Sequence, residues 1–472
     1  MAAEKLEKAL MDEDELSLNL IEAQYLLKNT RDQKNGKSVL ILVNGIELAG
    51  KGEAVKQLRE WVDPRDLLVK ADAPNPFNHK QPFWQPYADF IPAEGQMMVW
   101  FGNWYSDLLV TALNASNSLD DTLFDAYVED MRAFEQDLKN NHVDVIKIWF
   151  DLSWKSLQKR LDNMDPSEVQ WHKLHGLDWR NKKQYDNVQK LSQRFLKDWQ
   201  VINCEDEKAR DQQFAQIILG ALKDCPEHLS KGEVKWKQAA VPEALLHPEN
   251  EFEDNEDYKK ELKKLSLKVA EAMRADDRKA IVVLEGMDAA GKGGAIQRIV
   301  KNLDPREYDI HCIAAPEKYE LRHPYLWRFW TKLQTDEDIT IFDRSWYGRV
   351  LVERVEGFAN EVEWQRAYDE INRFEKDLVN SQTVVIKLWL AIGKDEQAAR
   401  FKAREETPHK RFKITPEDWR NREKWDQYLS AAADMFERTS TDSAPWYIIA
   451  TNDKNTARLK ILKAILKQLR AE

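Results

Sequence analysis

A glycine-rich segment in the second half of the chain has the residue types and spacing to bind phosphate. Residues 281–284 are apolar, as in a buried strand, and a helix is expected from Ala295 to Val300. Between them, Gly286, Gly291 and Lys292 give the pattern GxxxxGK. In such a loop backbone N–H groups approach phosphate oxygens, the lysine adds a charge, and the helix N-terminus adds a partial charge. The segment predicts a phosphate-binding loop (P-loop) of Walker A type.

The residue after the loop lysine departs from this motif. Gly293 stands where Ser or Thr usually supplies a hydroxyl ligand to Mg²⁺. Either the loop binds no metal or another oxygen supplies the ligand, and Asp288 inside the loop is the candidate. Asp343 ends a second apolar strand, which is the usual place for a carboxylate that orients phosphate-bound Mg²⁺. Asp288 and Asp343 are therefore the predicted metal residues.

Bulk properties bound the class of protein. The 472 residues exceed what one core usually organises, so two or three domains are expected. No apolar run approaches the roughly 20 residues that span a bilayer, and the charged N-terminus lacks a secretory apolar stretch. Three scattered cysteines indicate neither disulfides nor zinc, which favours a reducing cytoplasm. The net charge of −11 argues against broad nucleic-acid binding, although it allows a local basic channel.

The chain is an internal duplication. Residues 39–52 repeat the pattern of residues 280–293, which places Lys51 and Lys292 241 positions apart. Trp104-Tyr105 recurs as Trp346-Tyr347, and residues 178–181 recur as 418–421, at nearly the same offset. We expect a first domain over 1–225, a proline-containing acidic linker over 226–256 and a second domain over 257–472.

Short apolar segments alternate with helical stretches in each copy, which predicts a parallel sheet with helices on both faces. The helix before each loop is expected over Leu16–Asn29 and Tyr258–Ala275. The strands expected in the second copy are Ile281–Leu284, Asp309–Ile313, Ile339–Phe342, Val384–Leu390 and Tyr447–Ala450.

The two copies differ at the positions that phosphate chemistry needs. In the first copy, Phe101 replaces Asp343, Gly102 replaces Arg344 and Asp107 replaces Arg349. Gln57 replaces Arg298, and the basic residues at 402–413 have no basic counterpart segment. Because strand and packing residues persist, we interpret the first copy as a folded domain without catalysis. A second active site with different chemistry is the alternative, since Lys51 and Glu47 remain.

The second copy resembles the polyphosphate kinase 2 family, and the duplicated chain resembles its fused two-domain members. The resemblance rests on residues 286–294, 322–328, 343–355, 438–441, 444–446, 453–454 and 457–458, within a match that covers nearly all of 258–470. It implies a thymidylate-kinase-like α/β fold with a helical lid and Mg²⁺-dependent phosphate transfer between inorganic polyphosphate and a nucleotide. AMP is the expected acceptor in fused members, with ADP as product. The Asp in the loop and the Gly after its Lys are normal for this family.

Residue roles follow from the motifs and the resemblance together. Polyphosphate is a dense polyanion, so a basic lid over the loop is expected to contact it. The predicted lid residues are Lys402, Arg404, Lys410, Arg411 and Lys413. The predicted catalytic residues are Asp288, Lys292, Asp343 and Arg344. The predicted phosphate- and nucleotide-binding residues are Gly286, Ala289, Ala290, Gly291, Gly293, Gly294, Arg298 and Arg349.

The sequence leaves two other functions open. One is an ATP-dependent nucleoside monophosphate kinase on the same fold, which Gly293 and the long basic lid disfavour. The other is a polyphosphate-binding protein without turnover, which the complete residue set of the second copy disfavours. No nucleic-acid or membrane partner is expected, and assembly into a homo-oligomer is an open expectation.

Overall fold

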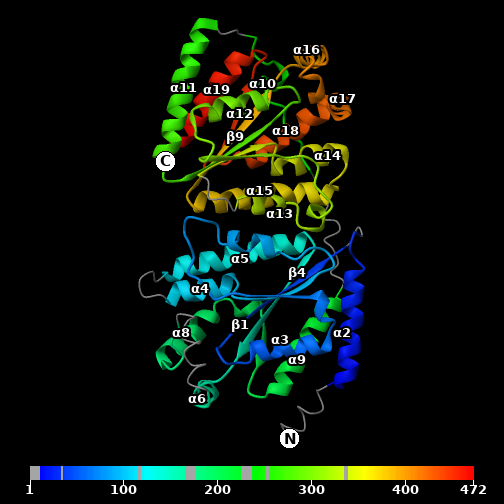
Figure 1. The fold of residues 1–472 in the computed structure, drawn as a ribbon, viewed down its shortest axis with the longest axis vertical. Coiled ribbons are helices and arrows are strands. Elements are labelled where there is room, and N and C mark those ends of the chain that lie inside the picture. The colour runs from blue at the N-terminus through cyan, green and yellow to red at the C-terminus, as the bar shows by residue number, and fades with distance from the viewer. Residues whose placement is uncertain are drawn as a thin grey trace. The chain divides into compact units, whose positions relative to one another are not determined.

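The computed structural model describes residues 11–32, 36–113, 119–164, 177–224, 236–250, 255–333 and 338–471. These residues fall into two compact units (Figure 1). The first unit comprises Met1–Asn78, Pro86–His228 and Glu317–Arg328, and the second comprises His79–Gln85, Leu229–Pro316 and Phe329–Glu472. Each unit is thus built on one repeat of the sequence. The domain boundaries proposed above stay a prediction.

Each unit contains a parallel five-stranded sheet whose central strand leads into the glycine-rich loop. The first sheet has the order β2-β3-β1-β4-β5, and the second has the equivalent order β7-β8-β6-β9-β10. The first set of strands is β1 (Ser38–Gly45), β2 (Leu67–Ala71), β3 (Met97–Phe101), β4 (Val143–Asp151) and β5 (Gln200–Asn203). The second set is β6 (Lys279–Gly286), β7 (Tyr308–Cys312), β8 (Ile339–Asp343), β9 (Thr383–Ala391) and β10 (Trp446–Ala450).

Helices cover both sheets. Those of the first repeat are α2 (Glu13–Lys28), α3 (Lys51–Trp61), α4 (Trp104–Leu113), α5 (Asp121–Asn140), α6 (Trp154–Asp162), α8 (Lys182–Ser192) and α9 (Glu207–Lys223). Those after them are α10 (Glu243–Leu246), α11 (Asn255–Ala275), α12 (Lys292–Ile299), α13 (Trp327–Trp330), α14 (Val352–Glu356), α15 (Glu361–Asn380), α16 (Lys394–Glu405), α17 (Pro416–Glu423), α18 (Trp425–Thr439) and α19 (Lys454–Leu469). In the second unit α11 and α12 pack against α19, and α15 packs against β9 and α18 (Figure 1).

The predicted fold class is confirmed. All five strands predicted for the second copy are present, with ends that differ by at most two residues from the observed bounds. The two helices expected before the loops correspond to α2 and α11. The helix after the second loop begins at Lys292, three residues earlier than expected, because the glycines at 293 and 294 belong to its first turn.

A buried ion pair explains why a glutamate and a lysine recur at equivalent positions in both repeats. Lys387 on β9 lies 2.7 Å from Glu375 on α15, and neither side chain is more than 2% exposed. Trp346 donates a hydrogen bond to Glu375 at 3.0 Å. In the first repeat Lys147 and Glu135 form the same pair at 2.7 Å. Since a buried charge without its partner is costly, these residues hold each fold together.

Residues 236–250 of the expected linker pack against the second unit. Trp236 donates to Asp434 at 2.9 Å and stacks on Tyr368 with ring centroids 5.3 Å apart. The guanidinium of Arg438 lies 3.8 Å from the Trp236 ring, where a cation is attracted to the aromatic face. Residues 236–250 therefore belong to that unit.

Among the described residues, no helix combines the length and the apolar character that crossing a membrane would require.

Candidate phosphate-binding site

The loop of the second repeat begins where β6 leaves the sheet. Gly286 has φ of 135°, and a Cβ there would lie 2.1 Å from the Leu390 carbonyl oxygen, so only glycine fits this close approach. Gly291 has φ of 113° and immediately precedes α12. The Lys292 ammonium returns over the loop and donates to the Gly286 carbonyl at 2.9 Å. The chain thus forms the strand, loop and helix that the motif predicts.

Donors from α16 fix the loop backbone. Arg400 is 6% exposed and donates to the carbonyl oxygens of Ala289 and Ala290 at 2.9 and 3.1 Å. Gln397 donates to the carbonyl of Asp288 at 3.0 Å. These contacts join the loop backbone to α16 around Ala289, which has a left-handed backbone with φ of 62°. A loop held in this way is preorganised for its ligand.

The first helical turn after the loop faces open space and arginine side chains. A Cβ at Gly293 would meet no heavy atom within 4 Å. A Cβ at Gly294 would lie 3.7 Å from Arg458 and 4.0 Å from Arg298. Arg298 itself donates to the Gly294 carbonyl at 3.2 Å. The glycines therefore leave room beside two guanidinium groups, which suits an anionic ligand.

Asp288 is held by two donors from outside the loop. Arg344 donates to one carboxylate oxygen at 3.0 Å, and Asn421 of α17 donates to the other at 2.9 Å. Tyr428 of α18 in turn donates to Asn421 at 3.1 Å. Arg344 has a left-handed backbone, with φ of 64°. The residue that follows the end of β8 is thus turned toward the loop.

Two further carboxylates lie around Arg344. Glu285 is 5% exposed, burial raises its pKa, and its carboxylate accepts a hydrogen bond from Ser345 at 2.8 Å. Both Glu285 and Asp343 interact electrostatically with Arg344, as Asp288 does. Within the described part of the chain, the Asp343 side chain has no hydrogen bond or ion pair. Its oxygens therefore remain available to a cation or a ligand.

The donor set suits a magnesium ion that arrives with phosphate. Mg²⁺ is commonly bound by one or two carboxylates together with substrate phosphates and water. Asp288 and Asp343 supply two such carboxylates near Arg344. Among the described residues, no group of three or more His, Cys, Asp or Glu side chains could hold a metal by itself. The residues fit an ion whose remaining ligands come from the phosphate.

Arg349 is engaged differently from Arg344. It lies 3.2 Å from Glu353 and 4.0 Å from Glu363, and it is 17% exposed. These carboxylates belong to α14 and α15. The structure therefore places Arg349 beside carboxylates of α14 and α15. The predicted contact of Arg349 with phosphate stays a prediction.

The predicted lid consists of α16 and the segment that follows it. Lys402 and Arg404 lie on α16, Lys410 follows, and Arg411 begins a 3₁₀ turn over Arg411–Lys413. Lys402, Lys410 and Arg411 are exposed, and none of these four cations has an ion pair within the described residues. The side chain of Lys413 lies outside the described part. Because acidic residues outnumber basic ones in this chain, a group of unpaired cations is notable. It is typical of an anion-binding surface.

The sequence analysis missed several residues at this site. Arg400, Gln397 and Asn421 fix the loop and Asp288, and Lys454 joins the cations around it. Burial lowers the pKa of Lys454, as do Arg400, Lys410 and Arg458 nearby. A signal was available for two of them, because Arg400 and Asn421 recur in the first repeat as Arg160 and Asn181. Arg160 also donates to a loop carbonyl, that of Leu48, at 2.6 Å.

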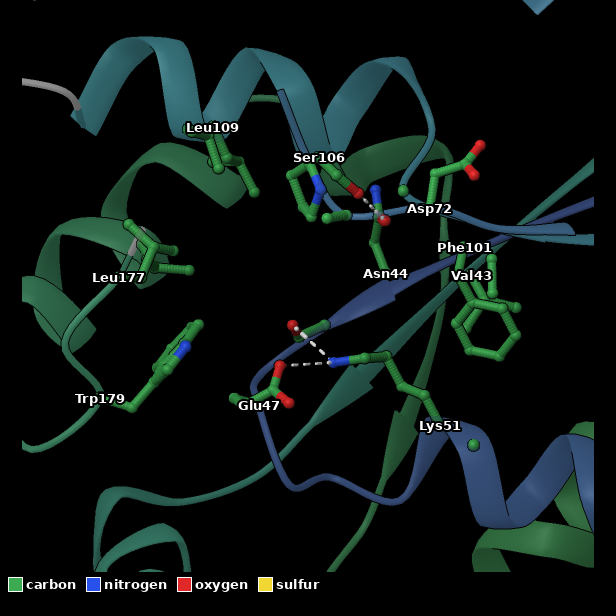
Figure 2. Close-up of a pocket in the computed structure, with 18 residues that line it drawn as sticks. Val43, Asn44, Glu47, Lys51, Asp72, Phe101, Ser106, Leu109, Leu177 and Trp179 are labelled. Carbon is green, nitrogen blue, oxygen red and sulfur yellow. Dashed lines mark hydrogen bonds and ion pairs between the residues drawn. The ribbon is translucent and has the colours of Figure 1, made fainter. Parts of the chain in front are cut away.

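The corresponding site of the first repeat keeps the loop and its lysine, with Phe101 near the loop where the second repeat has Asp343 (Figure 2). Lys51 donates to the carbonyl oxygens of Gly45 and Ile46 at 3.3 and 2.9 Å. It also lies 3.7 Å from Glu47, the counterpart of Asp288. Phe101 and Gly102 occupy the positions of Asp343 and Arg344. The ammonium in this repeat is therefore neutralised within its own loop.

Comparison with known proteins decides the family. The family model described as "Polyphosphate kinase 2 (PPK2)" matches the chain twice, over residues 8–229 and 251–472. The chain belongs to the polyphosphate kinase 2 family. Both repeats of this chain thus match the family model, including the one that lacks the counterparts of Asp343 and Arg344.

Full-length relatives extend the match to the whole chain. A polyphosphate:AMP phosphotransferase of Acinetobacter johnsonii is 73% identical over 472 residues, which cover 100% of this chain and 99% of the relative. A polyphosphate:AMP phosphotransferase of Pseudomonas aeruginosa is 41% identical, over 97% and 94% of the two chains. The crystal structure of a polyphosphate kinase 2 protein from Pseudomonas aeruginosa PA01 matches with a TM-score of 0.83 and 39% identity, over 99% and 96% of the chains.

Proposed function

We propose that this chain transfers the terminal phosphoryl group of inorganic polyphosphate to AMP, giving ADP. The observation that carries the proposal is the end-to-end match to a relative that bears the name polyphosphate:AMP phosphotransferase, at 73% identity. Both repeats take part in that match, so the arrangement of domains is the same. The geometry of the second repeat supports the same chemistry.

The loop of the second repeat binds the phosphoryl groups to be transferred. Lys292 and the N-terminus of α12 attract phosphate oxygens, while Gly293 and Gly294 let the ligand approach the backbone. Arg344, Arg298 and Arg458 are the guanidinium groups near that space, and they neutralise charge on the phosphoryl oxygens in the transition state. Arg400 and Asn421 act as positioning residues, since they hold the loop and Asp288.

Asp288 and Asp343 are the residues that would hold Mg²⁺, together with phosphate oxygens and water. The ion, when bound, offsets negative charge on the phosphoryl groups. Asp288 also keeps Arg344 in place through their 3.0 Å hydrogen bond. The carboxylates and the arginine thus form one group with more negative than positive charge, which suits the binding of a cation.

The transfer needs little acid–base chemistry. An α-phosphate oxygen of AMP attacks the terminal phosphorus of the polyphosphate chain. A new P–O–P bond forms, and the phosphoanhydride bond to the next phosphate breaks. The bonding pair leaves with the shortened polyphosphate. Because the attacking oxygen is already anionic at neutral pH, alignment and charge neutralisation account for most of the rate.

The cations of α16 and the following turn form a surface for the polyphosphate chain. Lys402, Arg404, Lys410 and Arg411 have no ion pairs in the described part of the molecule, so binding the polyanion breaks no internal pair. The surface lies on the same segment that fixes the loop through Arg400 and Gln397. The same segment would therefore hold both the bound polyphosphate and the loop.

The first repeat serves a role other than this transfer. Its loop lysine is paired with Glu47, and it has neither the strand-end aspartate nor the arginine of the second repeat. We propose that it contributes structure, assembly or ligand placement. A cytoplasmic location and a homo-oligomeric state also belong to the proposal.

The decisive experiment supplies purified protein with AMP and Mg²⁺, and with either polyphosphate or ATP as donor. ADP formation with polyphosphate supports the proposal, while ADP formation with ATP alone would establish a nucleoside monophosphate kinase instead. Polyphosphate binding without transfer to any nucleotide would establish a non-catalytic binding protein. A panel of nucleoside mono- and diphosphates then tests whether AMP is the preferred acceptor.

A further inference from the structure

The first repeat holds a cavity of about 610 Å³ beside its loop. The lining comes from the end of β1 and its loop, the end of β3, α4 and the segment around Trp179 (Figure 2). This edge, beyond the carboxyl ends of parallel strands, is where ligands of α/β sheets bind. The volume lies within the range of about 300–1,000 Å³ typical of small-molecule sites. The cavity therefore has the position and the size of a small-molecule site.

Its charges differ from those of the active repeat in a systematic way. Asn44 replaces Glu285, Phe101 replaces Asp343 and Gly102 replaces Arg344. Gln57 likewise replaces Arg298. Of the loop charges, Lys51 and its partner Glu47 persist. The cavity has thus lost the counterparts of both arginines and of the carboxylates Glu285 and Asp343.

The remaining ammonium is occupied. Lys51 is 19% exposed and has acceptors at 2.9, 3.3 and 3.7 Å, two carbonyl oxygens and the Glu47 carboxylate. Glu47 is one methylene longer than its counterpart Asp288, which instead interacts with Arg344 and Asn421. A phosphate would have to displace Glu47 to reach this charge, and among the described residues no arginine lines the cavity to assist, since Arg160 donates to the loop carbonyl of Leu48 instead. The cavity therefore disfavours anions.

The walls are apolar and partly aromatic. Leu109, Leu177 and Trp179 lie along one side of the open space in Figure 2, and Phe101 and Val188 are further apolar residues of the lining. Trp179 is 7% exposed, whereas its counterpart in the second repeat, Trp419, is 42% exposed and packs on Phe401. The same tryptophan has thus become part of a cavity wall in the first repeat. A flat ring would bury apolar surface here.

Hydrogen-bond acceptors lie at one side of this apolar space. Ser106 donates its proton to Asn44 at 2.5 Å, which leaves the lone pairs of its oxygen to accept a hydrogen bond. The Glu47 carboxylate also borders the cavity and accepts only. A ligand with hydroxyl or N–H donors attached to a flat ring matches these groups.

We propose that the cavity of the first repeat binds an uncharged nucleoside. The base lies against the walls formed by Trp179, Leu177 and Leu109, and the sugar hydroxyls donate to Glu47 and Ser106. The site is distinct from the phosphate-binding loop around Lys292. It gives the first repeat a ligand of its own, in place of the polyphosphate that its altered loop rejects.

The test is equilibrium dialysis of the full chain with labelled adenosine, in EDTA so that no transfer occurs. A large excess of AMP is added to occupy the second repeat. We expect one adenosine per chain to remain bound. Displacement of adenosine by AMP would overturn the proposal, because both ligands would then share one site. Absence of adenosine binding would overturn it as well.

Matched variants place the binding in the cavity. Leu177→Trp fills the space from an irregular segment and should weaken adenosine binding at least about tenfold, while Leu123→Trp on the exposed face of α5 should leave it unchanged. Trp179→Leu should weaken binding, and Trp419→Leu should not. Unchanged binding in a Leu177→Trp protein with a normal melting temperature would refute the assignment. Glu47→Gln frees Lys51, so AMP should gain at least about fivefold relative to adenosine at this site; no gain would contradict the charge argument.

Discussion

Arg344 and Gly102 occupy equivalent positions in the two repeats and have the same backbone conformation, with φ of 64° in each. For glycine this left-handed conformation costs little, whereas for arginine it costs on the order of 1–2 kcal/mol. At Gly102 a Cβ would even lie 2.1 Å from the Asp72 carbonyl oxygen. The second repeat therefore keeps a strained arginine where the first has a relaxed glycine. Strain retained in this way is typical of functional sites.

Replacing Arg344 with glycine should separate stability from activity. We expect Arg344→Gly to leave the melting temperature unchanged or higher, because the left-handed strain is relieved and the ion pair with Asp288 is partly exposed. We expect kcat/KM for transfer from polyphosphate to fall by about 10²–10³-fold, since a charge on the transition state is left unbalanced. Calorimetry and a coupled ADP assay measure the two effects. Equal losses of stability and activity would contradict the assigned role.

The two loop lysines form a matched pair for locating the active site. Lys292→Ala should abolish transfer, because phosphate loses the mobile cation of the loop, and Asp343→Ala should do so by removing a metal carboxylate. Lys51→Ala should leave most of the activity, because that lysine is already paired with Glu47. Initial rates at saturating polyphosphate provide the measurement. A comparable loss from Lys51→Ala would show that the first repeat is catalytic.

The fold could be predicted from the sequence because its signals are local. Apolar runs gave each strand, and the glycines at 286 and 291 gave the loop, since their backbone conformations exclude most other residues. Because the sequence is duplicated, each element could be predicted from two segments of the chain. Residues such as Lys292 and Arg344 were found because motif spacing places them at strand ends, where ligands bind.

Other parts of the site depend on contacts between distant segments. Arg400 acts through carbonyl groups about 110 residues away along the chain, and Asn421 reaches Asp288 across 133 residues. No sequence motif indicates which residues Arg400 and Asn421 contact. The pairing of Arg349 with Glu353 was likewise hidden, because an arginine near a strand end is compatible with phosphate or with a neighbouring carboxylate. The cavity beside Trp179 depends on how a tryptophan common to both repeats is turned.

Neutralising the lid should affect long polyphosphate more than short. We expect the variant with Lys402→Ala, Lys410→Ala and Arg411→Ala to raise KM for long chains by about tenfold or more, since each lost cation removes an electrostatic contact. KM for tripolyphosphate should change less, because the loop holds its phosphates. The salt dependence of KM should also weaken. Substituting Lys56, Lys155 and Lys159 in the first repeat is the control, and an equal effect there would point to net charge alone.

A buried carboxylate in the first repeat should make stability depend on pH. Burial raises the pKa of Asp107 to about 6, although its carboxylate accepts hydrogen bonds from the Tyr87 hydroxyl and the Asn75 N–H. The ordinary value is 3.8, so between about pH 4 and 6 the folded state binds more protons than the unfolded state, and stability falls as pH rises. Below pH 4 both states are protonated and the penalty vanishes.

Asp107→Asn should remove this dependence, because an amide has the same shape and no charge to bury. We expect the variant and the native protein to melt at nearly the same temperature at pH 4. At pH 7 the variant should melt a few degrees higher, in keeping with a penalty of at most about 3 kcal/mol. Transfer activity at pH 7 should stay within about twofold, because Asp107 lies in the repeat that lacks the catalytic set. Asp89→Asn, at an exposed position, is the control. A melting-temperature difference that is constant across this range would show that the Asp107 carboxylate is not destabilised by burial.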